Sequence, residues 1–570
     1  MPPVSSLAER WHTRADSIRQ RRAVGIALLV VLHLAALGVM LWSEIEPAPM
    51  AGFLLTWALL NFVWLTLIRR PALAAAISLA MIAVLIAVSH FKHSVIWMTA
   101  NFIDVMVIDS ETVTFLWAAF PKLRVVALVA VIVGTPLAAL IWWIDPLRVR
   151  RPVAALGAAL SLAGLIGLSL TVPLPPGQMF GDENYVSVFA RSGVEAAAEL
   201  VSHGILESDP LTADRLKLGM EDSCQPAGKP PHIILVLDES SFDIRAAKGI
   251  KVPEGYGRHF RSFDGKTRQF LVEGAGGPSW YTEYNVLSGL SSRSFGRFQF
   301  FVTRIAAGRV ERGLPHALRR CGYRTFSIYP VAGNFLGART YYKGAGFQHF
   351  FDGADIRGAK FEPDRFYFDL AARMIDRERG GSPLFLFVYL TANHFPWDWP
   401  FHPELTPGWR NPGNKPAEVD EYLRRQSMTE RDYADFLARL ERDFPGEPFL
   451  VVRFGDHQPD FAKLVIDPTI DAWEIGNRLL SFDPRYYRTY YAIDAINFLP
   501  VDLSSALDLL DAPYLPLVVQ EAAGLPLDPT FVEQKRILQR CKGLFYGCGG
   551  GAEARRFNRL LIDAGLIKGL

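Results

Sequence analysis

Five long apolar runs in the first third of the chain constrain its fold more than any other feature. Each is close to the roughly 20 residues that a helix needs to cross a bilayer. We therefore predict five membrane-spanning helices within residues 1–173. The first is a retained anchor and not a cleaved signal peptide, because it is long and no small-residue cleavage site follows it. The runs cover about residues 23–42, 51–68, 72–90, 125–144 and 153–173.

Arginines mark the side of the membrane on which each end of these runs lies. Cytoplasmic loops carry the excess of Lys and Arg, so the three arginine clusters predict a cytoplasmic amino terminus. With an odd number of spans, everything after about residue 174 lies in an extracytoplasmic, periplasmic compartment, outside the inner (cytoplasmic) membrane. The clusters are Arg10, Arg14, Arg19, Arg21 and Arg22 before the first run, Arg69 and Arg70 after the second, and Arg148, Arg150 and Arg151 between the fourth and fifth.

The segment at about residues 91–121, between the third and fourth runs, is too polar to cross a membrane. Its aromatic and aliphatic residues, among them Trp97, Phe102 and Trp117, interleave with Asp104 and Asp109. This pattern is typical of segments that lie in the membrane interface. A short helix that packs the spans together is an equally good interpretation.

The composition changes after residue 173. Residues 174–230 contain prolines, glycines and charges, and we interpret them as a linker. In residues 231–570, strand-like runs alternate with helical ones, which predicts an α/β domain whose mostly parallel sheet is sandwiched by helices. The predicted strands are residues 233–237, 325–329, 384–389 and 449–454, and the predicted helices are residues 313–321, 366–378 and 429–443.

Two of the predicted strands end in groups that bind metals. The run that ends near Phe242 delivers Glu239, and the run that starts at Phe449 delivers Asp456 and His457. Open α/β sheets place ligands at the carboxyl ends of their strands. Carboxylate and imidazole groups from two strand ends therefore predict one divalent cation between them.

A glycine-rich turn, residues 274–278, leads from these strands into a predicted helix that begins near Ser279. A hydroxyl at a helix amino terminus faces backbone N–H groups that favour an approaching anion such as phosphate. A divalent metal would activate this serine as a nucleophile. An ordinary helix-capping serine is the alternative interpretation, and Thr282 is a competing hydroxyl in the same turn.

Two further segments offer groups for an anionic substrate. Asn334 and Arg339 follow a predicted strand, and an arginine there could contact phosphoryl oxygens in a bidentate manner. His394 follows another predicted strand and could protonate a leaving oxygen. Alternatively, Arg339 is an ordinary surface residue and His394 has a structural role.

Net charge argues against one kind of partner, and the positions of the cysteines indicate where disulfides could form. The formal net charge is +2, and no basic stripe with interleaved aromatic residues is present, which argues against nucleic acid as a partner. All four cysteines fall in the predicted extracytoplasmic part, where an oxidising compartment permits disulfides. Cys541 and Cys548, which are close in sequence, are the better candidates for a pair, and four unpaired or buried thiols, among them Cys224 and Cys321, are the alternative.

The order of these motifs resembles one family. Strand-Glu239, the turn with Ser279, Gly322-Tyr323 followed by the Arg339 segment, Asn393-His394-Phe395-Pro396 and Gly455-Asp456-His457 occur in an order similar to that of the membrane-anchored phosphoglycerol and phosphoethanolamine transferases. These include lipoteichoic acid synthase and belong to the alkaline phosphatase and sulfatase superfamily. The resemblance covers the five-span anchor and most of residues 231–529, and it implies an alkaline-phosphatase-like fold for residues 231–570.

The resemblance also implies roles for single residues. Glu239, Asp456 and His457 would bind one manganese or zinc ion together with Ser279. Ser279 stands where the family usually has threonine, and it would become the phosphorylated nucleophile. Asn334, Arg339 and His394 would contact the substrate, with Arg339 and His394 also taking part in catalysis.

The implied reaction transfers a phosphoglycerol or phosphoethanolamine group from phosphatidylglycerol or phosphatidylethanolamine to a hydroxyl of an envelope glycan, such as a glucan, or of a glycolipid. A metal-dependent phosphodiesterase or phosphatase that uses water, and a catalytically silent protein that binds an envelope polymer, are the alternatives. A true sulfatase is excluded, because the residues after Ser279 lack the proline and arginine of the sulfatase signature.

Overall fold

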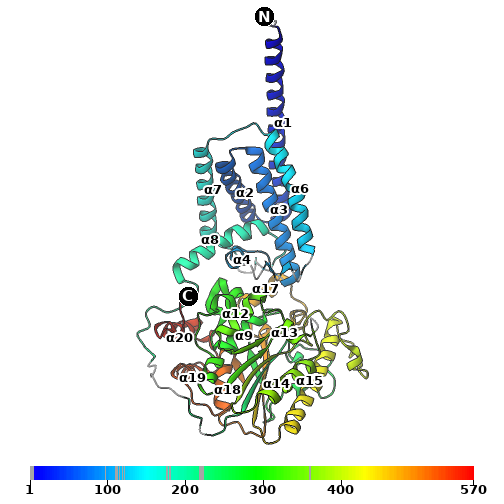
Figure 1. Ribbon diagram of the computed structural model, residues 1–570, viewed down its shortest axis with the longest axis vertical. Coiled ribbons are helices and arrows are strands. Elements are labelled where there is room, and N and C mark those ends of the chain that lie inside the picture. Colours follow the sequence, from blue (N-terminus) through cyan, green and yellow to red (C-terminus); the bar gives the residue numbers. More distant parts are fainter. Residues whose placement is uncertain are drawn as a thin grey trace. The chain divides into compact units, whose positions relative to one another are not determined.

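A computed structural model gives the structure of the chain and divides it into two compact units, Met1–Ser202 and His203–Leu570. The division falls within the predicted linker over residues 174–230, because helix α8 (Tyr185–His203) lies almost entirely in the first unit. The structure describes residues 5–96, 98–108, 113–114, 116–117, 120, 122–174, 178, 181–216, 224–226, 228–358 and 361–570 (Figure 1).

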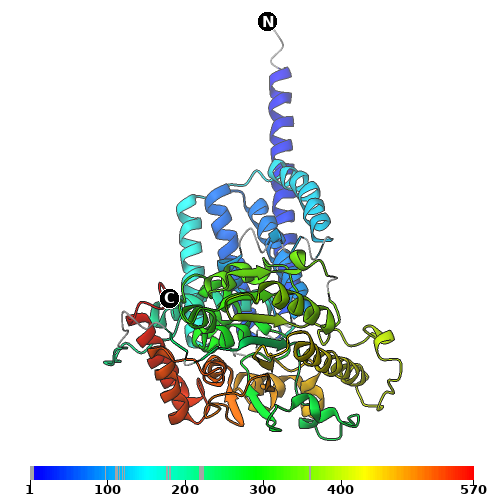
Figure 2. The same ribbon diagram turned by 60° about the horizontal axis from the view of Figure 1, so that its bottom comes forward.

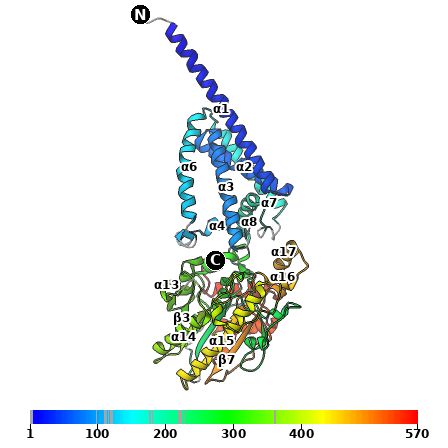
Figure 3. The same ribbon diagram turned by 90° about the vertical axis from the view of Figure 1, so that its right-hand side faces the viewer.

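The first unit contains the five predicted spans as helices. Five helices of the described residues are long and apolar enough to cross a membrane, which confirms the five-span prediction to within a few residues at each end. Figure 3 shows α2, α3 and α6 lying alongside α1. The helices are α1 (Ser5–Ser43), α2 (Pro47–Ile68), α3 (Pro71–Ile96), α6 (Lys122–Ile144) and α7 (Arg151–Thr171).

Small residues allow α2 and α7 to pack closely. A Cβ atom added at Gly157 of α7 would lie 2.6 Å from the ring of Phe62 on α2, and one at Gly164 would lie 2.9 Å from Leu55. Glycine at such positions lets membrane helices approach, because van der Waals packing drives their association in a lipid environment. The contact between α2 and α7 therefore depends on these glycines.

Arginines of all three clusters lie at one end of this helix bundle. The loop between α2 and α3 contacts the loop between α6 and α7, where the Val149 amide donates to the Arg69 carbonyl at 3.0 Å. The guanidinium of Arg21, near the start of the α1 span (Gln20–Ser43), lies 4.3 Å from the ring centre of Trp143 at the end of α6. A single basic end is what an anchor with a consistent orientation requires.

The predicted interfacial segment is described only in part. It contains α4 (Phe102–Val107), whose amino end is capped by Asn101 and Asp104 in a reciprocal capping box. Lys92 of α3 forms an ion pair with Asp104 at 2.8 Å. Several residues of this segment, including Trp97 and Asp109, lie outside the described residues, so its place in the interface stays a prediction.

The second unit is built on one sheet of eight strands, in the order β4-β3-β5-β1-β6-β7-β2-β8. Only β7 runs antiparallel to its neighbours, so the prediction of a mostly parallel sheet is confirmed. The strands are β1 (His232–Asp238), β2 (Arg268–Leu271), β3 (Arg324–Ile328), β4 (His349–Phe351), β5 (Leu384–Tyr389), β6 (Phe449–Gly455), β7 (Arg488–Ile496) and β8 (Leu509–Asp511).

Helices cover both faces of this sheet. Helices α14 (Asp364–Glu378) and α15 (Glu418–Asp443) pack on one face, where Tyr367, Phe436 and Leu440 meet Val236, Leu386 and other strand residues in one buried cluster. On the other face, Tyr342 of α12 (Ala338–Gly344) packs on Phe387 of β5. Figure 2 shows the strands between the yellow-green helices and the red carboxyl-terminal ones. Because helices cover both faces, the central strands β1, β5 and β6 are fully buried, as their nearly continuous apolar runs predict.

The remaining helices are short, apart from two near the carboxyl end. Cys541 and Cys548 form the predicted disulfide in this region, and a second disulfide joins Cys224 to Cys321. The helices are α9 (Ser279–Ser288), α10 (Val302–Ala306), α11 (Leu314–Arg320), α13 (Gly353–Ile356), α16 (Ala462–Ile466), α17 (Ala472–Leu480), α18 (Leu515–Ala522), α19 (Pro529–Cys541) and α20 (Ala552–Asp563).

Candidate active site

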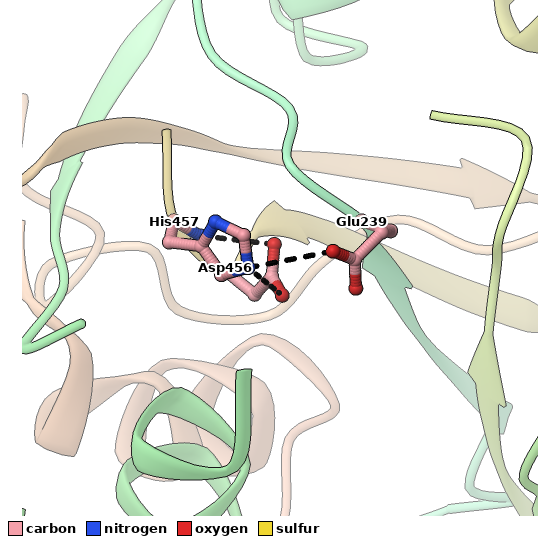
Figure 4. A group of neighbouring side chains, drawn as sticks. All are labelled: Glu239, Asp456 and His457. Atoms are coloured by element: carbon pink, nitrogen blue, oxygen red, sulfur yellow. Dashed lines mark hydrogen bonds and ion pairs between the residues drawn. The ribbon is translucent and has the colours of Figure 1, made fainter. Parts of the chain in front are cut away.

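The carboxyl ends of β1 and β6 meet at the centre of the sheet. The two strands are parallel neighbours, with Asp238 opposite Gly455, so Glu239 and Asp456 follow at the same level. One ligand atom from each of Glu239, Asp456 and His457 lies within 4.8 Å of the others, and all three residues are buried. Figure 4 shows the three side chains converging. The sheet register therefore brings together the two strand ends that the sequence singled out.

The imidazole of His457 is oriented for a role at the centre of this group. Its Nδ1 atom donates to the backbone carbonyl of Gln458 at 2.8 Å, and a carbonyl only accepts. Nδ1 must therefore carry the proton, which turns Nε2 toward the carboxylates. Nε2 lies 3.4 Å from Glu239 Oε1 and 3.4 Å from Asp456 Oδ2. A ligating histidine is commonly held in this way, by a carbonyl at the nitrogen that does not bind the metal.

The backbone conformation at the ends of β1 and β6 positions the side chains of Glu239 and Asp456. Ser240 has a φ of 52°, in the left-handed region that non-glycine residues rarely adopt. In this conformation its amide donates to Asp456 Oδ1 at 2.7 Å and its hydroxyl donates to Glu239 Oε1 at 2.9 Å. Gly455 precedes Asp456, and a Cβ atom there would lie 1.8 Å from the Ser241 carbonyl oxygen. Only glycine fits at that position.

The charges of Glu239, Asp456 and His457 shift one another's pKa values. Burial raises the pKa of Glu239, but the hydrogen bond and charge of His457 outweigh it and leave that pKa below its ordinary value. Burial, and after it the charge of Glu239, raise the pKa of Asp456 to about 7. Burial lowers the pKa of His457, yet Asp456 and Glu239 raise it to about 9. Two carboxylates buried side by side are costly unless a positive charge lies next to them.

A divalent metal ion fits this donor set. Asp456 Oδ2 is buried and accepts no hydrogen bond from any described residue, although Oδ1 of the same carboxylate accepts two. An orphaned carboxylate oxygen that faces a second carboxylate and an imidazole nitrogen is a group that a cation would satisfy. Oxygen and imidazole ligands suit both zinc and manganese.

Ser279 lies at the first residue of α9, beside the same group. Its Oγ is 3.2 Å from Glu239 Oε2, to which it donates, and 3.3 Å from His457 Nε2. Gly276 in the preceding turn has a φ of 71°, which explains a glycine there. The competing Thr282 donates its hydroxyl to the Asp456 backbone carbonyl at 2.6 Å, so that hydroxyl is engaged elsewhere. Of the two hydroxyls, Ser279 is the one in contact with the carboxylate and imidazole.

His394 follows β5 and lies near the group. Its charge is among the causes that lower the pKa of Glu239. The imidazole stacks between Phe361 and Phe395, with ring centres 4.3 Å and 4.5 Å away. The buried Arg425 of α15 donates to the His394 carbonyl at 2.7 Å and also to the carbonyls of Pro396 and Trp399, which fixes this loop.

Arg339 and Asn334 are placed differently from the metal-binding candidates. Arg339 forms ion pairs with Asp352 at 2.5 Å and with Asp355 at 3.3 Å, and its side chain is 41% exposed. None of its described contacts is with Glu239, Ser279, Asp456 or His457. Asn334 is half-buried and precedes a short 3₁₀ turn just before Arg339. The structure therefore does not bring these two residues into the group, and their predicted substrate contacts stay predictions.

Two residues next to the group were not singled out from the sequence. Tyr389, the last residue of β5, donates its hydroxyl to Glu239 Oε2 at 2.7 Å. Burial, followed by the charge of Glu239, raises the pKa of Tyr389 well above its ordinary value, so the hydroxyl keeps its proton. Ser240 is the second such residue. The only signal for Tyr389 in the sequence is its place at a strand end, which many tyrosines share.

Comparison with known proteins finds a family match for part of the chain. Residues 274–478 match the family model described as Sulfatase. No match to a curated protein sequence is found. The matched residues contain Ser279, Asn334, Arg339, His394, Asp456 and His457, whereas Glu239 lies before them.

Solved structures with related folds include two phosphotransferases. Streptococcus pyogenes phosphoglycerol transferase GacH, in complex with sn-glycerol-1-phosphate, is 15% identical, with a TM-score of 0.47, over 60% of this chain and 88% of its own. The phosphoethanolamine transferase EptA from Neisseria meningitidis is 12% identical, with a TM-score of 0.39, over 85% of this chain and 96% of its own. The Sulfatase match confirms the predicted resemblance to the alkaline phosphatase and sulfatase superfamily, and the matched segment carries Ser279, Asp456 and His457.

Proposed function

We propose that this protein transfers a phosphoglycerol or phosphoethanolamine group from a membrane phospholipid to a hydroxyl of an envelope glycan or glycolipid, through an intermediate on Ser279. The observation that carries the proposal is the position of the Ser279 hydroxyl at the start of a helix, 3.2 Å from Glu239 Oε2 and 3.3 Å from His457 Nε2. The motif order and the Sulfatase match add support. Sulfate ester hydrolysis is not proposed, because the residues after Ser279 lack the sulfatase signature.

Glu239, Ser279, Asp456 and His457 would hold one divalent ion, manganese or zinc. When bound, such an ion lowers the pKa of a coordinated hydroxyl and offsets negative charge on phosphoryl oxygens. The orphaned Asp456 Oδ2 and the orientation of His457 Nε2 support this assignment.

In the first step, Ser279 Oγ forms a bond to the phosphorus atom of the donor lipid, and the bond from phosphorus to the diacylglycerol oxygen breaks. The hydroxyl proton leaves along the hydrogen bond to Glu239, and the departing oxygen receives a proton from His394. Ser279 lies at the amino-terminal end of α9, where the helix dipole would favour the phosphoryl anion.

In the second step, the acceptor hydroxyl oxygen bonds to phosphorus and the bond to Ser279 Oγ breaks. The acceptor hydroxyl gives its proton to His394, which replaces the proton that His394 lost, and Ser279 Oγ takes its own proton back from Glu239, so the enzyme is restored. Arg339 and Asn334 would contact the substrate during these steps. For Arg339 this means sharing its guanidinium between the phosphoryl group and Asp352.

The donors and the compartment follow from the anchor. With the amino terminus in the cytoplasm, the second unit lies in the periplasm, next to the outer leaflet of the inner membrane. Phosphatidylglycerol or phosphatidylethanolamine would be the donor in that leaflet, and a glucan or another envelope glycan or glycolipid would be the acceptor.

Replacing Ser279 with alanine tests the proposal. We expect the Ser279→Ala protein to release diacylglycerol from labelled phospholipid about 10³-fold more slowly than the wild type or worse, because the nucleophile is gone. Thr282→Ala is the matched control and should stay within about tenfold of wild type, because Thr282 is not the nucleophile in this proposal. Both proteins should keep their melting temperature to within a few degrees.

Undiminished turnover by Ser279→Ala, with Thr282→Ala inactive, would move the nucleophile to Thr282. The products separate the alternative functions. A modified glycan or glycolipid detected by mass spectrometry supports the transferase, whereas free head group alone supports the phosphodiesterase. A wild-type protein that neither binds metal nor turns over lipid would indicate the silent binding protein.

A further inference from the structure

We propose that Tyr389 is a positioning residue for the metal site: it orients the Glu239 carboxylate and thereby sets the affinity of the site for its divalent ion. This inference rests on the metal site of the proposed function and assigns a role to a residue outside the ligand set.

The sheet register brings Tyr389 to Glu239. Strands β1 and β5 are parallel neighbours, with Tyr389 opposite Leu237, two residues before Glu239. From there the tyrosine hydroxyl reaches Glu239 Oε2 at 2.7 Å, the shortest hydrogen bond that this carboxylate accepts among the described residues. Tyr389 is only 5% exposed, so this hydroxyl does not exchange its partner for bulk water.

The donors around Glu239 divide between its two oxygens. Ser240 donates its hydroxyl to Oε1 at 2.9 Å, and His457 Nε2 lies 3.4 Å from the same oxygen. Ser279 and Tyr389 donate to Oε2. Ser279 and His457 are proposed metal ligands and reactants, and their contacts to Glu239 change when metal and substrate bind. Tyr389 and Ser240 are neither proposed ligands nor reactants, and between them they donate to both oxygens of the carboxylate.

Tyrosine has a specific advantage over phenylalanine at this position. A buried carboxylate that loses a hydrogen-bond donor is poorly solvated and can rotate to find another. Partners that orient a ligand are important for this reason, and their loss typically weakens metal binding about 10- to 100-fold. The ring of Tyr389 packs edge-on against Tyr329 at 5.6 Å, a contact that phenylalanine would keep. The hydroxyl alone is therefore the group to test.

The test measures the affinity of the metal-depleted, full-length protein for Mn²⁺ and for Zn²⁺ by titration calorimetry. We expect Tyr389→Phe to bind the preferred ion about 10- to 100-fold more weakly than the wild type. Tyr341→Phe is the matched control, because the Tyr341 hydroxyl is equally buried and has no hydrogen-bond partner among the described residues. It should bind metal with wild-type affinity. Glu239→Gln should lose binding altogether.

Unchanged metal affinity in Tyr389→Phe would overturn the inference, whatever its melting temperature. If both affinity and the metal-free melting temperature fall, a double-mutant cycle with Ser240→Ala decides. If the double variant's loss of binding free energy differs from the sum of the two single losses, the inference is supported, because both residues act through one carboxylate. If the double variant's loss equals that sum, the inference is contradicted. A wild-type protein that binds neither ion would instead remove the proposed metal site itself, which distinguishes the two failures.

Discussion

At the scale of single residues, a buried carboxyl group holds the loop that follows β5 and carries His394. Asp364 lies at the start of α14; its Oδ1 accepts hydrogen bonds from the amides of Thr391 and Ala392, and its Oδ2 is hydrogen-bonded to the hydroxyl of Thr429. It therefore fixes the turn that leads to His394. Burial, followed by the charge of Asp238, raises the pKa of Asp364 from its ordinary 3.8 to about 8.

This pKa predicts how stability depends on pH. Between about pH 4 and pH 8 the folded protein keeps the proton on Asp364 while the unfolded chain loses it, so the free energy of unfolding falls as pH rises, by at most about 1.4 kcal/mol per pH unit. Asp364→Asn mimics the protonated form, since its amide can donate to Thr429. We expect the variant to lose this part of the pH dependence, and melting temperatures measured from pH 4 to pH 8 check it. Parallel curves for the variant and the wild type would contradict the prediction.

At the scale of elements, the site depends on how β6 ends. A methyl group at position 455 would meet a backbone carbonyl, which cannot move aside cheaply. Gly455→Ala should therefore destabilise the protein by about 1–3 kcal/mol or more, and displace Asp456 enough to weaken metal binding. Gly476→Ala on α17 is the control. Nothing lies within 4 Å of the added atom, and alanine favours a helix, so stability should hold or rise slightly. Equal effects at both positions would contradict this account of β6.

The elements that the sequence predicts are those with strong hydrophobic patterns. Strands β1, β5 and β6 are mostly apolar, and β3 alternates polar with apolar residues; all four lie within a residue or two of their predicted ends. The short strands β2, β4 and β8 have three or four residues each, too few to show a pattern. Helix α15 begins at Glu418, eleven residues before its predicted start at Thr429. The prediction missed these first turns because they contain Arg424 and Arg425, which are buried and donate hydrogen bonds to the carbonyls of Phe401 and His394. Polar residues that are buried through hydrogen bonds hide the helical periodicity.

The same limit applies to the site. Glu239, Asp456, His457 and Ser279 could be singled out because they stand at strand ends and at a glycine-rich turn. The role of Tyr389 depends on the register between β1 and β5, which the sequence does not reveal. The ion pair of Arg339 with Asp352 depends on the loop after β4 and was equally hidden.

At the scale of the whole molecule, the basic end of the helix bundle predicts the topology. We expect the amino terminus in the cytoplasm and the carboxyl terminus in the periplasm, since Arg69, Arg148 and the start of the α1 span at Gln20 share one end of the bundle. A fluorescent reporter that folds only in the cytoplasm should be bright at the amino terminus and dark at the carboxyl terminus. An alkaline phosphatase reporter should give the opposite pattern, and two reporters with the same sidedness would contradict an odd number of spans.

The central claim is that the head group is carried on Ser279. The most direct measurement is peptide mass spectrometry of the full-length protein, quenched in acid during turnover of phosphatidylglycerol or phosphatidylethanolamine. The account predicts that the phosphorylated head group is attached to Ser279 and is absent when Ser279 is replaced by alanine. Turnover with no adduct on any peptide, or with the adduct on Thr282, would contradict it.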